Sequence, residues 1–540
     1  ADDSSIPQVT PGLGLLTDHD REILEGYGLE LAPRTEEKLS REYTIVYTTC
    51  AQPARKLYVT WPAQGETGGE KRPSFLIERL ETLFPQCQRR EKPAPSPDQL
   101  RSQAAGIPSI RAALSEDPRS AALFRHLDQA ARWQRGRLSP GAVSALYGKK
   151  VPMSASRMDQ YQSCHFAYFL RYGLDARARR PAGFDAPEYG TFVHYVLEHV
   201  LRAIQDQGGA AQVSDEAIQG FATQAVRDYV HGKLGGMEHQ TPRFRYLFRR
   251  LEKGVRAVVE NVVAELRSSD FQPLWFELGF GYGPDKSLPP VNRTSHGITL
   301  SISGFVDRVD GWRNEKDGRL YLRVVDYKTG RKSFDLTEVW NGLGLQLLLY
   351  LFTLEREGSP LFGEQPVPAG VLYLPAREAV LKGSRTMDEA ARQKELDKEL
   401  LRKGLILEDA DVVEAMEHGE GSLRFLPVKV KTKKDETTIS GDVLVSAEKL
   451  GRLDLHIQTI LAQICQEIAR GNIDADPFWR SKEQNACTYC EFAQACQFEE
   501  SAEATGDHRR WAPTVENKTF WAKLSQTEEG GEPHGRQTNP

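Results

Sequence analysis

The sequence has 540 residues, of which 39% are hydrophobic and 27% charged, and its formal net charge at pH 7 is -5. This length exceeds what a single hydrophobic core usually serves, so we expect two or three domains in a globular protein. No run of about 18 apolar residues occurs, and the polar start Ala1-Asp2-Asp3-Ser4-Ser5 lacks the pattern of a signal peptide. We therefore expect a cytoplasmic protein without a membrane span. The negative net charge does not indicate nucleic-acid binding, although a local basic groove would be hidden in that sum.

The first 150 residues predict mixed structure followed by a connecting segment. Runs of β-forming residues lie at 43–47 and 56–61, and the apolar spacing at 74–84 is typical of a helix, so we assign residues 1–90 to an α/β domain. Pro, Ser, Arg and Ala then dominate residues 91–150, with a helical pattern at 121–133. We interpret this stretch as a connection and place a domain boundary near residue 150.

Residues 151–500 combine long helices with a group of strands, and we assign them to one domain. Apolar periodicity predicts helices at 158–172, 187–206, 214–233, 243–268, 344–355 and 447–470. Short β-rich runs predict strands at 275–280, 298–309, 320–327 and 370–373. The charged stretches at 388–403 and 429–436 indicate a solvated helix and a loop. Residues 501–540 form a tail whose Gly, Glu, Pro and Gln content predicts disorder from about residue 525.

Acidic side chains end two neighbouring strands of this domain. Because side chains alternate along a strand, Asp326 and Lys328 lie on one face at the end of the apolar run 320–327. A turn through 314–318 predicts a hairpin that sets Asp307 of the preceding strand beside them. Asp307 and Asp326 are then placed to share one cation, and carboxylate oxygens suit Mg²⁺ or Mn²⁺.

Such a cation would lower the pKa of a bound water and offset charge on a phosphate, while Lys328 orients the nucleophile or stabilises the developing charge. An ordinary ion pair at a strand end is the alternative, because Asp-x-Lys strings are common. Neighbouring residues favour the chemistry: Gln346 and Tyr350 lie one turn apart on an apolar helix, and Glu277 is an acid among apolar strand residues. His194 lies on an amphipathic helix, where a structural role is the alternative.

Together these residues resemble the PD-(D/E)xK nucleases of the RecB and AddB type. The resemblance rests on an ordered series between residues 190 and 350: Gly190-x-x-x-His194, Glu277, Gly304-x-x-Asp307-Arg308-x-Asp310, Asp326-Tyr327-Lys328 and Gln346-x-x-x-Tyr350. It implies a restriction-endonuclease-like α/β nuclease core with added helices and Mg²⁺-dependent hydrolysis of DNA phosphodiesters. It also implies that His194, Asp307 and Asp326 hold Mg²⁺ or Mn²⁺, that Glu277 binds metal or water, that Lys328 is the catalytic lysine, and that Gln346 and Tyr350 contact DNA.

Four of the seven cysteines have a spacing that favours a metal over disulfides. Cys487-x-x-Cys490-x5-Cys496 groups three thiols, and Cys164 precedes the nuclease motifs. From the residues alone, four thiolates suit either tetrahedral zinc or a [4Fe–4S] cluster. The resemblance implies the [4Fe–4S] cluster, as a staple across the domain, because these nucleases carry the same cysteine spacing. The family often follows its first cysteine with Pro-Phe, whereas this chain has His165-Phe166, so a different ligand set stays open.

Residues 47–59 resemble the last motif of superfamily 1 helicases, with Cys50 where that motif has an arginine. No Gly-x-x-x-x-Gly-Lys-[Ser/Thr] phosphate loop occurs, so we expect no ATP hydrolysis by this chain. The resemblance therefore implies that residues 1–90 are the remnant of an inactive helicase-like domain.

The resemblance implies a function as well. It is that of a nuclease (exonuclease) subunit in a helicase–nuclease complex, a heterodimer with a partner of the AddA type. Such a complex processes the ends of DNA double-strand breaks for recombinational repair, and this subunit would cut the unwound 5′-ended strand. Two alternatives stay open: a catalytically inactive nuclease fold that binds DNA or docks a partner, and a free-standing Cas4-like exonuclease. Retention of Asp307, Asp326 and Lys328 argues against the first, and the helicase remnant argues against the second.

Overall fold

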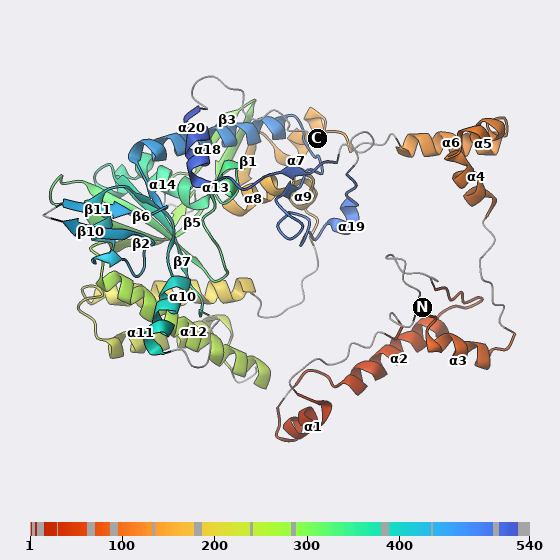
Figure 1. Ribbon diagram of the computed structural model, residues 1–540, viewed down its shortest axis with the longest axis horizontal. Coiled ribbons are helices and arrows are strands. Elements are labelled where there is room, and N and C mark those ends of the chain that lie inside the picture. The colour runs from red at the N-terminus through yellow and green to blue at the C-terminus, as the bar shows by residue number, and fades with distance from the viewer. Residues whose placement is uncertain are drawn as a thin grey trace. The chain divides into compact units, whose positions relative to one another are not determined.

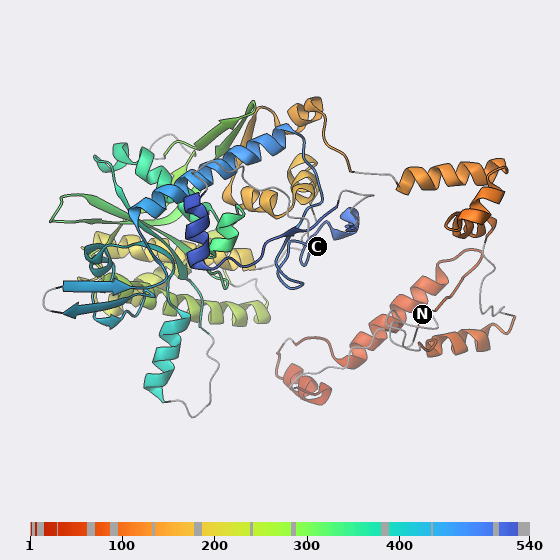
Figure 2. The same ribbon diagram turned by 45° about the horizontal axis from the view of Figure 1, so that its top comes forward.

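The computed structural model describes most of the chain in two compact units (Figures 1 and 2). The described residues are 2, 6–7, 16–29, 31–61, 71–86, 96–131, 135–177, 186–237, 241–281, 288–379, 388–433, 436–500 and 507–526. One unit comprises Ala1–Leu127 and Met237–Arg250, and the other Asp128–Gly236 and Leu251–Pro540. No helix in the described part of the chain is both long and apolar enough to cross a membrane.

Helices are the regular elements of residues 1–127 within the described part. They are α1 (Asp18–Gly26), α2 (Thr35–Ala51), α3 (Phe75–Leu83), α4 (Pro97–Ala105), α5 (Pro108–Leu114) and α6 (Pro118–Ala131). Helix α3 confirms the prediction at 74–84, and α6 confirms the one at 121–133 as far as Ala131. The two predicted strands are wrong: residues 43–47 lie inside α2, and residues 56–61 form no strand. The described residues therefore do not support the expected α/β character of residues 1–90.

The threonines of the β-branched run in α2 bond to the helix itself. The hydroxyls of Thr44, Thr48 and Thr49 each donate to the carbonyl oxygen four residues earlier, at 2.8–2.9 Å. Such bonds satisfy the hydroxyl groups within the helix itself. The acids Glu36 and Glu37 in the first turn further favour a helix start there.

A six-stranded mixed sheet forms the centre of the larger unit, in the order β12-β8-β7-β6-β5-β2. Its strands are β2 (Gln272–Phe280), β5 (Gly304–Arg313), β6 (Leu320–Lys328), β7 (Val367–Pro375), β8 (Lys403–Leu407) and β12 (Leu444–Val445). Strand β6 pairs antiparallel with β5 and parallel with β7, and every residue of β6 except the last is buried. The sequence of a strand that is buried on both faces is typically a nearly continuous apolar run. The run at residues 320–327 predicted this strand, and β6 confirms it.

Helices cover both faces of this sheet, as the α/β prediction expected (Figure 1). Helices α10 (Ala186–Asp206), α11 (Asp215–Lys233) and the part of α12 (Pro242–Arg267) from Leu251 onward lie on one side, and α14 (Gln346–Glu357) and α18 (Ala447–Ala469) on the other. These five confirm predicted helices to within two residues. The remaining helices and turns are α7 (Pro140–Tyr147), α13 (Leu336–Trp340), α15 (Ser359–Phe362), α16 (Glu389–Glu399), α17 (Ala410–Met416), α19 (Ala493–Cys496) and α20 (Asn517–Gln526).

The predicted helix at 158–172 is broken at Cys164. It consists of α8 (Ala155–Ser163), α9 (His165–Tyr168) and a π-helical turn, Phe169–Gly173, with Cys164 itself extended. The break has a distant cause: a carboxylate oxygen of Asp476 accepts the backbone N–H of His165 at 3.1 Å. This bond satisfies one of the unpaired N–H groups at the start of α9, so the chain can begin a new helix there.

Two further predictions are corrected by strand pairing. The predicted strand at 298–309 is two strands: β4 (Ile298–Ile302) joins β1 (Lys150–Met153) and β3 (Val291–Ser295) in a small sheet, and β5 enters the large one. The predicted loop at 429–436 is the start of a hairpin, β10 (Lys429–Lys433) with β11 (Glu436–Ser440), flanked by β9 (Gly421–Ser422). Strands β13 (Phe478–Trp479) and β14 (Arg510–Trp511) form a separate pair. Apart from the end of α20, the tail predicted to be disordered lies outside the described residues.

Gly304 begins β5 at a point where the backbone passes close to the Tyr350 ring. A Cβ atom at residue 304 would lie 2.0 Å from the Tyr350 hydroxyl oxygen. We therefore expect Gly304→Ala to lower the free energy of unfolding by about 1–3 kcal/mol, measured by urea denaturation. The matched control is Gly451→Ala on α18, where no atom lies within 4 Å of the new Cβ. Adding Tyr350→Phe to Gly304→Ala should recover part of the loss, and equal stability of the two glycine variants would contradict this close contact.

Candidate functional site

Three neighbouring strands and one helix bring the predicted acids and histidine together. The strand registers leave Glu277 of β2 opposite Asp307 of β5, and Asp307 opposite Asp326 of β6. Directly opposed residues of paired strands have neighbouring side chains. Helix α10 adds His194, whose ring lies edge-on to the Tyr327 ring, with centroids 5.5 Å apart. The hairpin prediction is thereby confirmed.

The imidazole of His194 is held between a backbone carbonyl and two carboxylates. Its Nε2 atom is 3.1 Å from the carbonyl oxygen of Tyr327, and its Nδ1 atom is 3.4 Å from Asp307 Oδ1 and 4.0 Å from Glu277 Oε1. A neutral imidazole must donate its proton to the carbonyl, which directs the Nδ1 lone pair towards the acids. Ligand atoms of His194, Glu277 and Asp307 all lie within 4.8 Å of one another, the closeness required of groups that share a metal ion.

Asp307 and Asp326 are each oriented by one further contact. The second carboxylate oxygen of Asp307 accepts the backbone N–H of Tyr327 at 2.6 Å. The ammonium of Lys328 lies 2.6 Å from Asp326 Oδ2 and 5.4 Å from the centre of the Tyr373 ring. Asp307 thus keeps Oδ1 directed at the cation position, and Lys328 stands beside the acid that the sequence paired with it.

Glu277 adopts a backbone conformation that is uncommon for a side chain of its kind. Its φ angle is +49°, in the left-handed region, inside strand β2. Holding such a residue there costs on the order of 1 kcal/mol or more, and strain of this kind is most often found at functional sites. The irregular backbone is consistent with a carboxylate that is turned towards His194 at the expense of regular pairing.

The three carboxylates and the histidine strongly perturb one another. Burial and the charge of Asp307 raise the pKa of Asp326 to about 6 and that of Glu277 to about 7. Burial opposes the charged form of His194, but its hydrogen bond with Asp307 and the charges of Asp307, Asp326 and Glu277 raise its pKa to about 9. Several acids that resist ionisation in one small space indicate an excess of negative charge, which a divalent cation would relieve. The residues present therefore fit Mg²⁺ or Mn²⁺.

The other face of the same strands carries a buried ionic network. The side chains of Arg308, Asp310 and Arg323 are fully buried, with Arg308 Nε 2.7 Å from Asp310 Oδ1 and Arg323 Nε 2.8 Å from Asp310 Oδ2. Glu265 of α12 joins them to Arg402, at 2.8 Å. Arg308 and Asp310 of the motif series therefore support the sheet from behind and do not line the cation position.

Gln346 and Tyr350 lie on α14, one turn apart as predicted. The Tyr350 side chain is 3% exposed and stacks on Phe280, with ring centres 4.9 Å apart. Gln346, the first residue of α14, is half-buried. Tyr350 thus packs behind the strand ends, and contact of either residue with DNA stays a prediction.

The four predicted cysteine ligands lie in one neighbourhood, from both ends of the domain. Cys164 belongs to a small apolar cluster with Phe492, and Cys490 packs against it. Arg135 reaches Cys496, with Nη2 2.6 Å from its carbonyl oxygen and 3.6 Å from its Sγ. Burial and the nearby Cys490 and Cys496 thiols raise the pKa of Cys487, because adjacent thiolates repel one another. Iron or zinc would relieve that repulsion, so the donor set fits a thiolate-bound metal.

Two details bear on which ligand set is present. His165 Nδ1 is 2.6 Å from Asp476 Oδ2, and its ring meets Tyr161 edge-on, so His165 is already engaged away from the thiols. Tetrahedral zinc, with Zn–S bonds of about 2.3 Å, would hold its sulfurs about 3.8 Å apart. Among the described residues, no three cysteine sulfurs come within 4.8 Å of one another. The described thiols therefore form no compact group of ligand atoms like that of His194, Glu277 and Asp307, and the identity of a metal there stays a prediction.

Comparison of the sequence with known proteins identifies the family to which the chain belongs. A model of the PD-(D/E)XK nuclease superfamily matches residues 152–497, which include every site residue above apart from Arg135. The chain belongs to this superfamily. It is also similar to B-type subunits of the ATP-dependent helicase/deoxyribonuclease. The identity is 31% with that of Desulforudis audaxviator, over 96% of this chain and 46% of the relative, and 26% with that of Clostridium acetobutylicum, over 98% and 48%. The chain thus spans about half the length of these curated relatives.

Some residues beside the nuclease site were missed by reasoning from the sequence. Asp159 of α8 accepts the backbone N–H of Gly344 at 2.9 Å, close enough to the site for Lys328 to affect its pKa. Arg331, Arg377 and Lys403 gather beside Lys328 in a basic pocket. Each comes from a different segment, and no short motif links them, so only the fold could bring them together.

Metal affinity at the site should rise with pH. Binding a cation requires Asp326, Glu277 and His194 to lose the protons that they hold up to pKa values of about 6, 7 and 9 in the metal-free protein. Raising the pH from 6 to 9 removes this competition, so the apparent Mn²⁺ affinity should increase roughly tenfold or more. Calorimetry in buffers of different ionisation enthalpy measures both the affinity and the protons released. His194→Gln should flatten the increase above about pH 8, and an affinity independent of pH would show that these groups do not hold the ion.

Proposed function

We propose that this chain is a metal-dependent deoxyribonuclease that hydrolyses phosphodiesters of an unwound DNA strand. The observation that carries the proposal is the convergence of His194, Glu277 and Asp307 beside the Asp326–Lys328 pair. Bound by these ligands, Mg²⁺ or Mn²⁺ would supply a water of lowered pKa and offset charge on the scissile phosphate. An inactive scaffold would have no use for a group of buried acids that repel one another. Retention of these ligands therefore favours an active nuclease.

Each residue has a distinct part in this proposal. Asp307, with one oxygen fixed by the Tyr327 amide, and His194, with its tautomer set by the Tyr327 carbonyl, would hold the cation, and Asp326 on the neighbouring strand would complete its ligands. Glu277, whose carboxylate lies in the same group of ligand atoms, would bind the cation or its water. Lys328 places positive charge beside Asp326 and stabilises charge that develops on the phosphate oxygens.

The wider assignment follows the similarity to the B-type helicase/deoxyribonuclease subunits. We propose that the chain acts in a helicase–nuclease complex that processes the ends of DNA double-strand breaks for recombinational repair, with an AddA-type helicase–nuclease as its partner. In that complex it would cut the 5′-ended strand. Its similarity to those proteins extends over nearly the whole chain, including residues in front of the nuclease match, and this favours the complex over a free-standing Cas4-like exonuclease.

We also propose that Cys164, Cys487, Cys490 and Cys496 hold a structural [4Fe–4S] cluster. Their shared neighbourhood and the mutual effect of their thiols support it. A cluster here would close a loop of about 300 residues, so it would restrain the unfolded chain more than the native one.

Changing Asp326 to Ala should lower the rate of Mg²⁺-dependent cleavage of single-stranded DNA by roughly 10²–10³-fold or more, because it removes a metal ligand and the partner of Lys328. The measurement is cleavage of an end-labelled oligonucleotide, with circular dichroism to check folding. Glu315→Gln, an exposed acid on the β5–β6 turn, is the matched control and should cleave normally. Cleavage by Asp326→Ala at the normal rate would refute the proposed site.

Changing Cys490 to Ser should lower the iron content and the stability of the purified protein, because three thiolates hold a cluster less well than four. Iron and zinc analysis with visible absorbance provides the measurement. Cys50→Ser, at a cysteine far along the chain from the other four, should keep its iron and serves as the control. The cluster assignment fails if the unchanged protein contains zinc in place of iron.

A further inference from the structure

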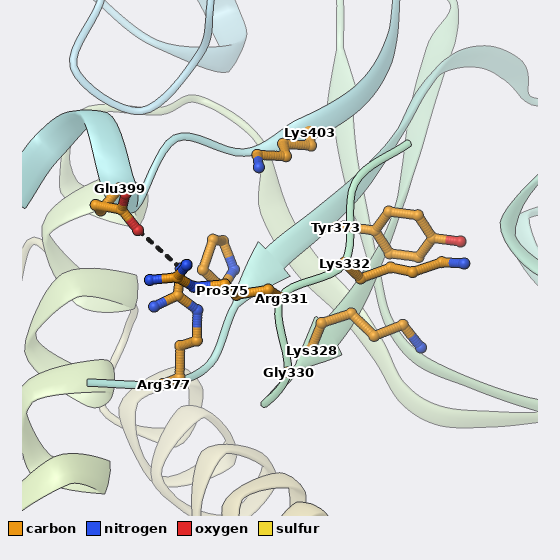
Figure 3. Close-up of a pocket in the computed structure, with 9 residues that line it drawn as sticks. All are labelled: Lys328, Gly330, Arg331, Lys332, Tyr373, Pro375, Arg377, Glu399 and Lys403. Atoms are coloured by element: carbon orange, nitrogen blue, oxygen red, sulfur yellow. Dashed lines mark hydrogen bonds and ion pairs between the residues drawn. The ribbon is translucent and has the colours of Figure 1, made fainter. Parts of the chain in front are cut away.

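A basic pocket adjoins the candidate nuclease site at the carboxyl ends of β6 and β7 (Figure 3). Its volume is about 200 Å³, smaller than the roughly 300–1,000 Å³ of ordinary small-molecule sites, so it suits a compact group. Strand β8 and the loop that follows β6 complete its walls. Its charged lining residues are Lys328, Arg331, Lys332, Arg377, Glu399 and Lys403.

Cations in this pocket outnumber the acids that could neutralise them. Arg377 Nη2 lies 3.1 Å from Glu399, the single acid of the lining, and Lys332 Nζ lies 2.9 Å from Glu338. Within the described part of the chain, Arg331 and Lys403 have no ion-pair partner. Lys328 is paired with Asp326, so three of the five cations are neutralised and two, Arg331 and Lys403, give the pocket a local positive charge in a protein whose overall charge is negative.

Arg331 and Arg377 extend to one side of the pocket, towards Glu399, whereas the ammonium groups of Lys328 and Lys332 point to the other side, as Figure 3 shows. Figure 3 shows the guanidinium groups of Arg331 and Arg377 side by side near Glu399. The hydrogen bond from Arg377 lowers the pKa of Glu399, and the charges of Arg331 and Lys403 act in the same direction, so all three lie within electrostatic reach of it. The Nε atom of Arg377 is buried and has no hydrogen-bond acceptor in the described structure. An anion in the pocket would neutralise the positive charge of these groups and accept a hydrogen bond from Arg377 Nε.

The pocket is continuous with the cation site through Lys328, which lines the pocket and contacts Asp326. Lys328 of β6 pairs with Pro375 of β7, and Tyr373 of β7 pairs with Lys403 of β8. With strands about 4.8 Å apart, Lys403 lies two strands and on the order of 10 Å from the Lys328 strand. This separation favours a phosphate that lies further along the DNA strand than the one being cut.

We propose that Arg331, Arg377 and Lys403 bind an internal phosphodiester of the DNA strand, beyond the scissile phosphate. Arginine suits this role because its planar guanidinium can donate two hydrogen bonds to one phosphate. Glu399 positions the Arg377 guanidinium in the absence of DNA. The proposal rests on the proposed nuclease function and deepens it: the pocket anchors the strand and sets its position over the cation site.

The test measures binding separately from cleavage. The full chain is titrated in EDTA with fluorescein-labelled oligothymidylate, and the double variant Arg331→Gln/Lys403→Gln is compared with the unchanged protein over a range of salt concentrations. We expect affinity to fall roughly tenfold or more and the slope of log affinity against log salt to decrease by about 1, because phosphate contacts release counterions. Arg392→Gln/Lys394→Gln, two exposed cations on α16, removes the same charge outside the pocket and should change both quantities far less.

A circular oligothymidylate, which has no ends, separates an internal phosphodiester from a terminal phosphate. The pocket variant should lose the same factor with the circular strand as with 5′-phosphorylated and 5′-hydroxyl linear strands. A loss confined to the 5′-phosphorylated strand, or a loss no larger than that of the α16 control, would overturn the proposal. Failure of the proposed nuclease function would give a different result. Either Asp326→Ala would cleave normally or the unchanged protein would not cleave, but the pocket variant would still bind DNA more weakly than the unchanged protein.

Discussion

The antiparallel pairing of β5 with β6 is the constraint on which the site depends. One face of this pair presents Asp307 opposite Asp326, and the other buries Arg308, Asp310 and Arg323 without exposure to solvent. A slip of one residue would turn every side chain to the opposite face, so the buried charges would lose their partners and the acids would enter the packing. Because an unpaired buried charge costs several kcal/mol, the ionic network behind the sheet fixes the register that sets the metal ligands.

A second constraint joins the two ends of the nuclease domain through ordinary contacts. Asp476, from the segment that leads to the later cysteines, caps α9 at His165 and binds its ring, and Arg510 lies 3.1 Å from the same carboxylate. Burial would raise the pKa of Asp476, but Arg510 and His165 lower it, so the acid is ionised where it is needed. His165 thus has a structural role directly after Cys164. The cysteines are brought near one another by these contacts, and a cluster would add to an arrangement that the polypeptide already favours.

The sequence predicted those parts of the fold and site that local pattern determines. The long helices, the central strand and the Asp326–Lys328 pair follow from periodicity, alternation and a short turn, which act within a few residues. Patterns of that range could not predict the break at Cys164, since Asp476 lies far along the chain. They also missed the helix over residues 43–47, which belongs to a helix of 17 residues that begins at Thr35. The basic pocket was missed for a similar reason, because Arg331, Arg377 and Lys403 come from separate segments and a net charge of -5 conceals them.

Opposite charges therefore lie side by side at the ends of β5, β6 and β7. Glu277, Asp307 and Asp326 concentrate negative charge that would repel a phosphate, whereas the pocket beyond Lys328 attracts one. A strand anchored in the pocket can bring its next phosphate to the acids only when a cation lies between them. On the proposed function, DNA positioning at the cutting point would depend on the metal, whereas binding in the pocket would not. Lys328 contacts Asp326 and lines the pocket, so it lies at the boundary of the two charges.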